Sequence, residues 1–287
     1  MNLSDFFLLY AKKGFITYLK KSCYRKFCRM NKGKKFVSNT RYGSCLNIVI
    51  GDSVDNEIYL NGYFERGTSE LMVKLAKVSN CFVDIGCNIG YYSCLFGSLN
   101  KNAKIFSIDP NPQMITRVTE NLQLNRIKTY KTFNFGVSSE EGTLDFYINN
   151  RRHSLGSFIR PYKNEPDGIS VIKVDVRPLS KILNFSEIDR AVLKIDAEGY
   201  EWKILAGVSV AEMEKIDYVV LEFATEHIEK SNKKGIDIFD IQWTSNYKMF
   251  SILDDGSVEE FLYKPENRYC MNLLMVRNGA IEISEIK

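Results

Sequence analysis

The sequence predicts an α/β fold in which helices cover both faces of a mostly parallel sheet. Two observations support this prediction. Short apolar runs alternate with helical patterns from residue 81 onward, and the first run ends in a glycine turn, DIGCNIG, at residues 84–90. Strands that alternate with helices form parallel sheets, because each crossover helix returns the chain to the same edge of the sheet. The 287 residues are enough for one large domain, or for one domain with an appendage.

The expected elements begin in a β-α-β-α-β order. Strands are expected at residues 81–85, 104–108 and 131–137, and helices at residues 89–99 and 114–124. Pro112 suits the first turn of the second helix, where a backbone N–H has no partner in any case. The second half adds strands at residues 191–195, 218–223, 249–253 and 271–276, a helix ending near Leu205 and a helical stretch at residues 236–243. No apolar run approaches the roughly 20 residues that span a bilayer.

Three regions are expected along the chain. Residues 1–35 form a basic amphipathic arm, and residues 36–80 form a capping extension of short strands and turns that ends in a helix near residues 69–78. Residues 81–287 form the main domain. An insertion near residues 142–176 alternates apolar and polar side chains, which indicates strands or a hairpin.

The arm differs in charge from the rest of the chain. Residues 1–35 contain ten Lys/Arg and one acid, whereas the remainder has 29 basic and 34 acidic residues, so a mildly acidic body carries a basic arm. Ile16, Leu19, Cys23 and Phe27 give the arm one apolar helical face. A helix of this kind binds an anionic membrane surface, or else packs its apolar face on the domain. The seven cysteines include no CxxC pair, so we expect a cytoplasmic protein, in peripheral contact with the inner membrane face if the arm binds lipid.

The glycine turn differs from a turn that binds a dinucleotide. A dinucleotide-binding turn reads G-x-G-x-x-G, whereas this one reads D-x-G-x-N-x-G, with Asp84 at its start and Asn88 in place of the middle glycine. The Asp84 carboxylate repels a pyrophosphate but suits a cationic ligand, such as the sulfonium and α-ammonium groups of S-adenosylmethionine. Asp109 ends the second strand, where an acid accepts hydrogen bonds from ribose hydroxyls. Gly136 ends the third strand, where an adenine ring is expected.

Five motifs follow in order between residues 55 and 275. They are FVDIGCNIGYYS, IFSIDPNP with ENLQLN, FGVSSEEG, LKIDAEGYEWKILAG and VVLEF. Together they resemble the FkbM family of S-adenosylmethionine-dependent methyltransferases. Two positions depart from the usual family sequence, since Cys87 stands where alanine is common and Asp109 stands where glutamate is more frequent.

The resemblance implies a class I methyltransferase fold, which is Rossmann-like, with a seven-stranded sheet whose last strand is antiparallel. It also implies methyl transfer to an oxygen, commonly a hydroxyl of a sugar or polyketide-type natural product. We expect the acceptor to be a sugar in a glycan or a lipid-linked glycan. Carried over by position, the expected cofactor-binding residues are Asp84, Gly86, Cys87, Asn88, Gly90, Asp109, Pro110, Asn111, Phe135, Gly136 and Val137.

The chemistry requires a base or a metal ion, because a sugar hydroxyl is a poor nucleophile near neutral pH. The candidate catalytic residues are Asp196, Glu198, Glu222 and His153. Adjacent strand ends bring Asp196 and Glu222 close together, so that one pKa is raised or the pair holds Mg²⁺ or Mn²⁺. Alternatively, Lys194 simply pairs with a carboxylate, and Glu198 caps the helix that follows.

Two other functions stay open. Lys194, Asp196, Lys203 and Glu222 resemble the lysine-aspartate-lysine-glutamate sets of ribose methylases, which would make RNA the acceptor. The acidic body is poorly suited to contact phosphates, so a nucleic-acid partner is not favoured. The second alternative is a catalytically inactive module that binds S-adenosylmethionine.

Overall fold

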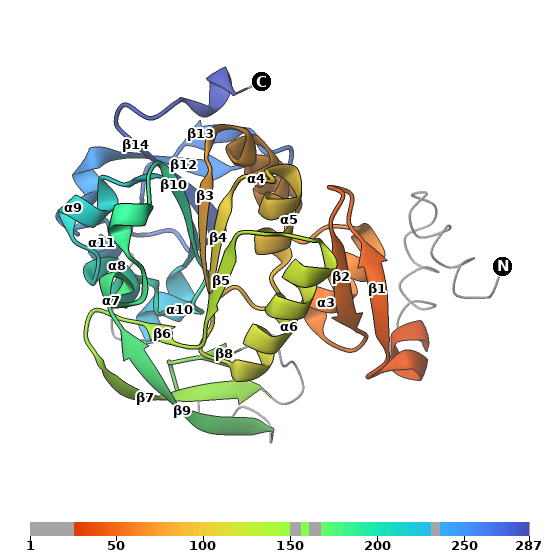
Figure 1. Ribbon diagram of the computed structural model, residues 1–287. Helices are drawn as coiled ribbons and strands as arrows, with labels where there is room; N and C mark the ends of the chain where they lie inside the picture. The colour runs from red at the N-terminus through yellow and green to blue at the C-terminus, as the bar shows by residue number, and fades with distance from the viewer. Residues whose placement is uncertain (1–25, 150–155, 161–167, 231–235, 287) are drawn as a thin grey trace.

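The computed structural model describes residues 26–149, 156–160, 168–230 and 236–286, and an eight-stranded sheet forms its centre (Figure 1). Five neighbouring strands run parallel: β11 (Ile216–Ala224), β10 (Ala191–Ile195), β3 (Cys81–Ile85), β4 (Lys104–Ile108) and β5 (Tyr130–Phe133). Beyond β11 lie the antiparallel β14 (Cys270–Arg277), then β12 (Tyr247–Ile252) and β13 (Val258–Glu260). The predicted α/β fold with a mainly parallel sheet is confirmed, and the last strand is antiparallel, as in a class I methyltransferase.

The expected count of seven strands is wrong by one. The extra strand is β13, which pairs only with β12 at the edge of the sheet. Its sequence is VEE, with both glutamates exposed, so it lacks the apolar alternation by which a half-buried strand is recognised.

Helices cover both faces of the sheet, and alternate residues of each strand face a different helical layer. Phe82 belongs to the core on one face, which includes residues of α3 (Ser53–Asn61), α4 (Arg66–Val78), α5 (Tyr91–Leu99) and α6 (Pro112–Leu124). Its neighbour Val83 belongs to the core on the other face, which includes residues of α7 (Leu179–Ile182), α8 (Glu201–Ala206), α9 (Val210–Met213), α10 (Thr225–Lys230) and α11 (Ile236–Phe239). Short 3₁₀ helices lie at Phe185–Glu187 (η1), Thr244–Asn246 (η2) and Ile283–Glu285 (η3). In the part of the chain described, no helix is long and apolar enough to span a membrane.

A second sheet of four strands lies below the carboxyl ends of the main sheet in Figure 1. Its order is β6 (Gly136–Val137), β9 (Ile169–Arg177), β7 (Gly142–Asn149) and β8 (Gly156–Ser157). The predicted single strand at residues 131–137 is therefore wrong, because β5 ends at Phe133 and β6 pairs with β9. The reason is the side chain of Asn134, which donates hydrogen bonds to the carbonyls of Asp109 and Pro110 and turns the chain out of the main sheet.

The extension before the main domain packs against α6. It consists of the hairpin β1 (Lys35–Asn39) and β2 (Cys45–Val49), followed by α3 and α4. Asn121 on α6 accepts a hydrogen bond from the backbone N–H of Asn47, and Asn125, which caps the end of α6, accepts one from the N–H of Cys45. The extension thereby reaches the carboxyl ends of the central strands. Most of the predicted basic arm, residues 1–25, lies outside the described residues.

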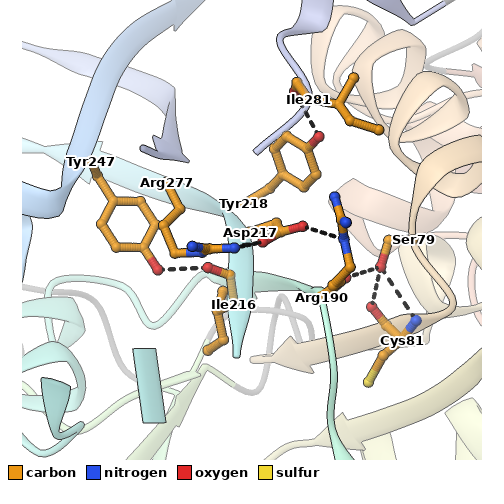
Figure 2. Close-up of polar contacts among 9 residues, drawn as sticks. All are labelled: Ser79, Cys81, Arg190, Ile216, Asp217, Tyr218, Tyr247, Arg277 and Ile281. Atoms are coloured by element: carbon orange, nitrogen blue, oxygen red, sulfur yellow. Dashed lines mark hydrogen bonds and ion pairs between the residues drawn. The ribbon is translucent and has the colours of Figure 1, made fainter. Parts of the chain in front are cut away.

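The amino ends of β10 and β11 hold an Asp217 cluster, which we define as Asp217, Arg190 and Arg277 (Figure 2). Asp217 is almost fully buried. Arg190 Nε donates to its Oδ2 atom at 3.0 Å, and Arg277 donates to its Oδ1 atom through two nitrogens. This buried carboxylate is thus paired on both oxygens, as a buried charge must be to avoid a large desolvation cost.

Candidate active site

A cavity lies at the carboxyl ends of β3, β4, β10 and β11, where open α/β sheets bind their ligands. The extension lines one side through α3 and Phe64, and the second sheet lines another through Phe146 and Phe158. Among the described residues, Lys194 is the only basic side chain in the lining, whereas the acidic ones are Glu57, Glu65, Asp84, Asp109, Asp196, Glu198 and Glu222. A cavity with this excess of carboxylates favours a cationic ligand.

Asp84 ends β3 and supplies the first of these carboxylates. Its side chain is almost fully buried, and its Oδ2 atom accepts a 2.6 Å hydrogen bond from Ser93 Oγ. Its Oδ1 atom is buried without a hydrogen-bond partner among the described residues. Burial raises the pKa of the Asp84 carboxyl, and the Lys194 ammonium opposes this rise. A ligand that is cationic or donates a hydrogen bond would offset the cost of burying the Asp84 Oδ1 atom without a partner.

The glycines of the turn are required by the protein itself. Gly86 has a φ of 73°, and a Cβ atom there would lie 1.8 Å from the carbonyl oxygen of Asp196. Gly90 has a φ of 80°, and its Cβ would lie 2.3 Å from a methyl group of Val118 on α6. Gly86 therefore allows the β3 turn to lie against the end of β10, so any side chain there disturbs the fold as well as a ligand.

Asp109, the residue expected to bind ribose, also holds the turn closed. Its Oδ2 atom accepts the N–H of Asn88 at 3.0 Å, and its Oδ1 atom accepts the N–H of Asn111 at 2.8 Å. Asn88 has a φ of 51°, in the left-handed region where asparagine is tolerated. Burial raises the pKa of Asp109 to about 7, although the two backbone hydrogen bonds lower it. Each carboxylate oxygen has a second lone pair, so these bonds leave acceptor capacity for a ligand.

The remaining predicted cofactor residues gather on the side of the cavity near β4 and the second sheet. Cys87, Pro110, Asn111, Phe135 and Val137 all line it. Gly136 does not line it, because the ring of Phe158 lies where a Gly136 side chain would be. Phe135 is stacked by Arg177, whose guanidinium carbon lies 4.0 Å from the ring centroid. The apolar surfaces of Phe135, Val137 and Phe158 form a wall suited to a planar ring.

Lys194 and Asp196 form an ion pair at the end of β10, which confirms the expectation that Lys194 pairs with a carboxylate. Lys194 Nζ lies 2.8 Å from Asp196 Oδ2 and 4.9 Å from the centroid of the Tyr92 ring. Burial alone lowers the pKa of Lys194, but the carboxylates of Asp196, Asp84 and Glu65 outweigh burial and raise it. The lysine is therefore charged, and it fixes Asp196 at the cavity wall.

Glu198 and Glu222 lie together, and His227 joins them from α10. One ligand atom from each of the three residues lies within 4.8 Å of the other two. Glu222 Oε2 and His227 Nδ1 are buried without hydrogen-bond partners among the described residues. Burial and the nearby carboxylates of Asp196 and Glu198 raise the pKa of Glu222 well above its ordinary value. His227 was not predicted, since a single histidine in a weakly helical segment gave no signal.

Glu201 takes the role that the sequence left open to Glu198. Glu201 accepts hydrogen bonds from the N–H groups of Ala197 and Gly199, so it holds the turn before α8, which Glu198 was expected to cap. That expectation for Glu198 is wrong, because its backbone is left-handed with a φ of 52° and its side chain lies near His227. His153 lies outside the described residues.

Glu65 is a cavity residue that sequence reasoning missed. It accepts hydrogen bonds from Tyr92 Oη at 2.7 Å and from Asn272 Nδ2 at 2.9 Å. Its backbone is left-handed, with a φ of 43°, at the start of α4. Its partners are 27 and 207 residues away in the sequence, so no local pattern could identify it. Lys203, in contrast, pairs with Glu140 and does not line the cavity, so the lysine-aspartate-lysine-glutamate set is not assembled there.

A protein-family model matches most of the chain. The model described as Vibrio cholerae RfbT protein matches residues 21–262 of this chain. The matched segment includes the extension, the glycine turn and all the strands that line the cavity.

Comparison with curated proteins gives weaker but consistent similarities. The chain is 26% identical over 159 residues to the hexuronic acid methyltransferase AglP of Haloferax volcanii, covering 55% of this chain and 62% of that protein. It is 23% identical over 172 residues to the 2-O-methyltransferase NoeI of Sinorhizobium fredii, covering 55% of this chain and 69% of that protein. The aligned part therefore spans less than two thirds of AglP. Among solved structures, M. jannaschii TYW2 in complex with AdoMet aligns with a TM-score of 0.42 and 12% identity, covering 86% of both chains.

Proposed function

Because the chain belongs to the family described as Vibrio cholerae RfbT protein, and because the curated proteins it resembles are methyltransferases, we propose that it is an S-adenosylmethionine-dependent O-methyltransferase. The resemblance of its motifs supports assignment to the FkbM type. The acceptor is a hydroxyl group of a sugar, in a glycan or a lipid-linked glycan, as the names of the AglP and NoeI relatives suggest.

The observation that carries this proposal is the charge of the cavity. Seven acidic side chains and a single lysine line it among the described residues. A pyrophosphate would be repelled, whereas the sulfonium and ammonium groups of S-adenosylmethionine would be attracted. Asp84 supports the assignment most directly, since its buried Oδ1 atom has no partner among the described residues and can accept a hydrogen bond from the ammonium group.

Different groups of the predicted cofactor residues would bind different parts of S-adenosylmethionine. Asp84 and the backbone of the glycine turn would bind the methionine part, and Asp109 would accept hydrogen bonds from the ribose. The wall formed by Phe135, Val137 and Phe158 would bind the adenine. Gly136 would contribute indirectly, because its lack of a side chain lets Phe158 pack against β6.

Asp196 is the proposed general base. Methyl transfer is a displacement in which the bond from the methyl carbon to the acceptor oxygen forms while its bond to sulfur breaks. The hydroxyl proton passes to the Asp196 carboxylate, which Lys194 holds in place at 2.8 Å. Glu222 and Glu198 lie at the neighbouring strand and loop, where they would contact the acceptor.

A divalent cation, Mg²⁺ or Mn²⁺, is part of this proposal. Asp196 and Glu222 were the predicted ligands. One oxygen of Asp196 is already engaged by the buried Lys194, which makes Asp196 a poorer metal ligand than Glu222. Glu198 and His227 each place a ligand atom within 4.8 Å of one on Glu222 and fit the geometry better than Asp196 does.

We further propose that residues 1–35, 36–80 and 81–287 are distinct units, with the arm making peripheral contact with the inner face of the cytoplasmic membrane. The composition of the arm supports this, since ten of its residues are Lys or Arg. A lipid-linked sugar would be met at that surface.

The proposed function is tested by ligand binding and by glycan analysis. S-adenosylhomocysteine should bind to the purified protein in calorimetric titration, and Asp84→Asn should weaken binding at least about tenfold by removing a charge-assisted hydrogen bond. Asp145→Asn, at an exposed carboxylate paired with Lys173, serves as the matched control. Mass spectrometry of envelope glycans should show one added methyl group in cells that make the protein and none in cells that make Asp196→Asn. Absence of S-adenosylhomocysteine binding would contradict the proposal.

A further inference from the structure

Glu198, Glu222 and His227 form a compact set of metal-ligand atoms at the edge of the cavity. Glu198 follows β10, Glu222 lies near the end of β11 and His227 lies on α10. One atom from each lies within 4.8 Å of the other two, and His227 Nδ1 lies 3.4 Å from Glu198 Oε2. We call these three residues the Glu-Glu-His set.

The backbone around this set is arranged to bring the three side chains together. Gly199 has a φ of 97°, and a Cβ atom there would lie 2.7 Å from the carbonyl oxygen of His227. The loop after β10 can therefore lie directly against α10 only because residue 199 is glycine. Ser157 Oγ donates a 3.0 Å hydrogen bond to the carbonyl of Glu198 and holds the left-handed backbone of that residue. Such strain at a non-glycine residue is typical of functional sites.

Two polar atoms of the set are buried, although all three side chains are partly exposed. Glu222 Oε2 and His227 Nδ1 have no hydrogen-bond partner among the described residues. Two lysines lower the pKa of Glu198, but Lys194 forms its ion pair with Asp196, and Lys230 lies 3.7 Å from Glu226. The two carboxylates disfavour each other's ionised form, and a cation bound between them and the imidazole would remove that repulsion.

We propose that Glu198, Glu222 and His227 bind one divalent transition-metal cation. Three protein ligands leave coordination positions open, as in catalytic rather than structural metal sites. Two carboxylate oxygens suit Mn²⁺ and Mg²⁺ alike, but the imidazole nitrogen favours a first-row transition metal over Mg²⁺. The set shares Glu222 with the ligand pair expected from sequence and replaces Asp196 by Glu198 and His227.

The role of this cation rests on the proposed function. An open position would hold the acceptor hydroxyl beside Asp196, and the metal would lower the pKa of that hydroxyl. As the methyl group leaves sulfur and bonds to oxygen, the hydroxyl proton passes to Asp196 and the sulfonium becomes a neutral thioether. Asp196 remains free to act as base because it is not a ligand.

The experiment is a titration of the full chain with Mn²⁺, followed by electron paramagnetic resonance of the free ion. We expect one bound Mn²⁺ per chain, and His227→Ala and Glu222→Gln should each weaken binding at least about tenfold. Glu226→Gln is the matched control, because Glu226 is a carboxylate on the same helix whose exposed side chain points to Lys230. Glu198→Gln, which preserves shape, gives the same comparison if His227→Ala does not fold.

S-adenosylhomocysteine binding, measured on the same samples, separates the two proposals. If S-adenosylhomocysteine binds but Mn²⁺ binding is absent, or is equal in Glu222→Gln and Glu226→Gln, the metal site is overturned and the proposed function stands. If Mn²⁺ binds through the Glu-Glu-His set but S-adenosylhomocysteine does not bind, the metal site stands and the methyltransferase assignment fails.

Discussion

The two ends of β11 each carry a carboxylate, Asp217 near the amino end and Glu222 near the carboxyl end. Asp217 accepts hydrogen bonds from Arg190 and Arg277 on both of its oxygens (Figure 2). Glu222 has one oxygen buried without a partner among the described residues, and its pKa is raised by burial and by neighbouring carboxylates. One strand thus holds, at one end, a carboxylate paired with two arginines. At the other end it holds a carboxyl group with one oxygen that has no hydrogen-bond partner among the described residues.

The difference separates a structural role from a functional one. Asp217 joins the arginines of two other segments, the turn before β10 and the strand β14, so its charge contributes to holding the sheet together. The carboxylates around Glu222 repel one another, so the pKa of Glu222 is raised, and either a proton or a cationic ligand relieves the repulsion. Proteins commonly accept lower stability at sites that bind or catalyse.

Asp196→Asn, beside the carboxyl end of β11, gives the largest expected effect, which is a loss of methyl-transfer turnover. The amide cannot accept the hydroxyl proton, so turnover should fall about 10²–10⁴-fold, while S-adenosylhomocysteine affinity changes much less. The measurement is transfer of labelled methyl from S-adenosylmethionine to the envelope glycan fraction. Asp189→Asn, at an exposed loop position, is the control. Near-normal turnover in Asp196→Asn would leave Asp196 with a structural role like that of Asp217.

Arg277→Met tests the opposite end. Removing one partner of a buried ion pair costs about 3–5 kcal/mol. Because Arg190 would still pair with Asp217, we expect the free energy of unfolding to fall by about 2 kcal/mol. Urea unfolding followed by circular dichroism measures this. Arg268→Met, at an exposed arginine paired with Glu229, should cost no more than about 1 kcal/mol. Equal losses in the two variants would mean that the Asp217 cluster is no more stabilising than a surface pair.

The pH dependence of cofactor binding tests whether Asp109 behaves as a site residue. The pKa of Asp109 in the protein is about 7. Burial raises it most, and the carboxylates of Asp84 and Asp196 raise it further. The Cys87 thiol lies nearby. The pKa of Asp109 is higher in the folded protein than in the unfolded chain. Its contribution to the free energy of unfolding is therefore fully present below pH ~4 and is lost as pH rises through ~7.

Ribose hydroxyls donate to the ionised form of Asp109. S-adenosylhomocysteine should therefore bind about tenfold more tightly at pH 8 than at pH 6. Calorimetric titration at the two pH values measures this, and Asp109→Asn should remove most of the difference. A pH dependence that is unchanged in Asp109→Asn would assign the titration to another carboxylate of the cavity.

Glu222→Gln gives the smallest expected effect on folding, and of opposite sign to that of Arg277→Met. The amide resembles the protonated form that the raised pKa of Glu222 favours, so the free energy of unfolding should stay the same or rise by up to about 1 kcal/mol. Urea unfolding without added metal measures it. A loss as large as that of Arg277→Met would mean that Glu222 is paired in the folded protein, and the contrast between the two ends of β11 would fail.

Sequence reasoning located most of the strands because their signals are local. The strands β3, β4 and β10 begin and end where the apolar runs do, and the glycine turn lies between β3 and α5. The third strand was predicted too long, because the chain leaves the sheet at Asn134 through bonds to residues 24 and 25 positions earlier. The edge strand β13 was missed because its side chains are mostly exposed.

The sequence by itself determined the order of strands and helices, the position of the glycine turn and the acidic residues at the strand ends. These follow from the spacing of apolar residues, from the backbone conformations that glycine allows, and from the rule that parallel strands present their carboxyl ends at one edge of the sheet. Only the tertiary structure decided which distant charges meet: two arginines enclose Asp217, and Glu198, Glu222 and His227 converge. The physical reason is that partners of buried charges come from segments far apart in the chain, and packing, not local pattern, decides which of them come within bonding distance.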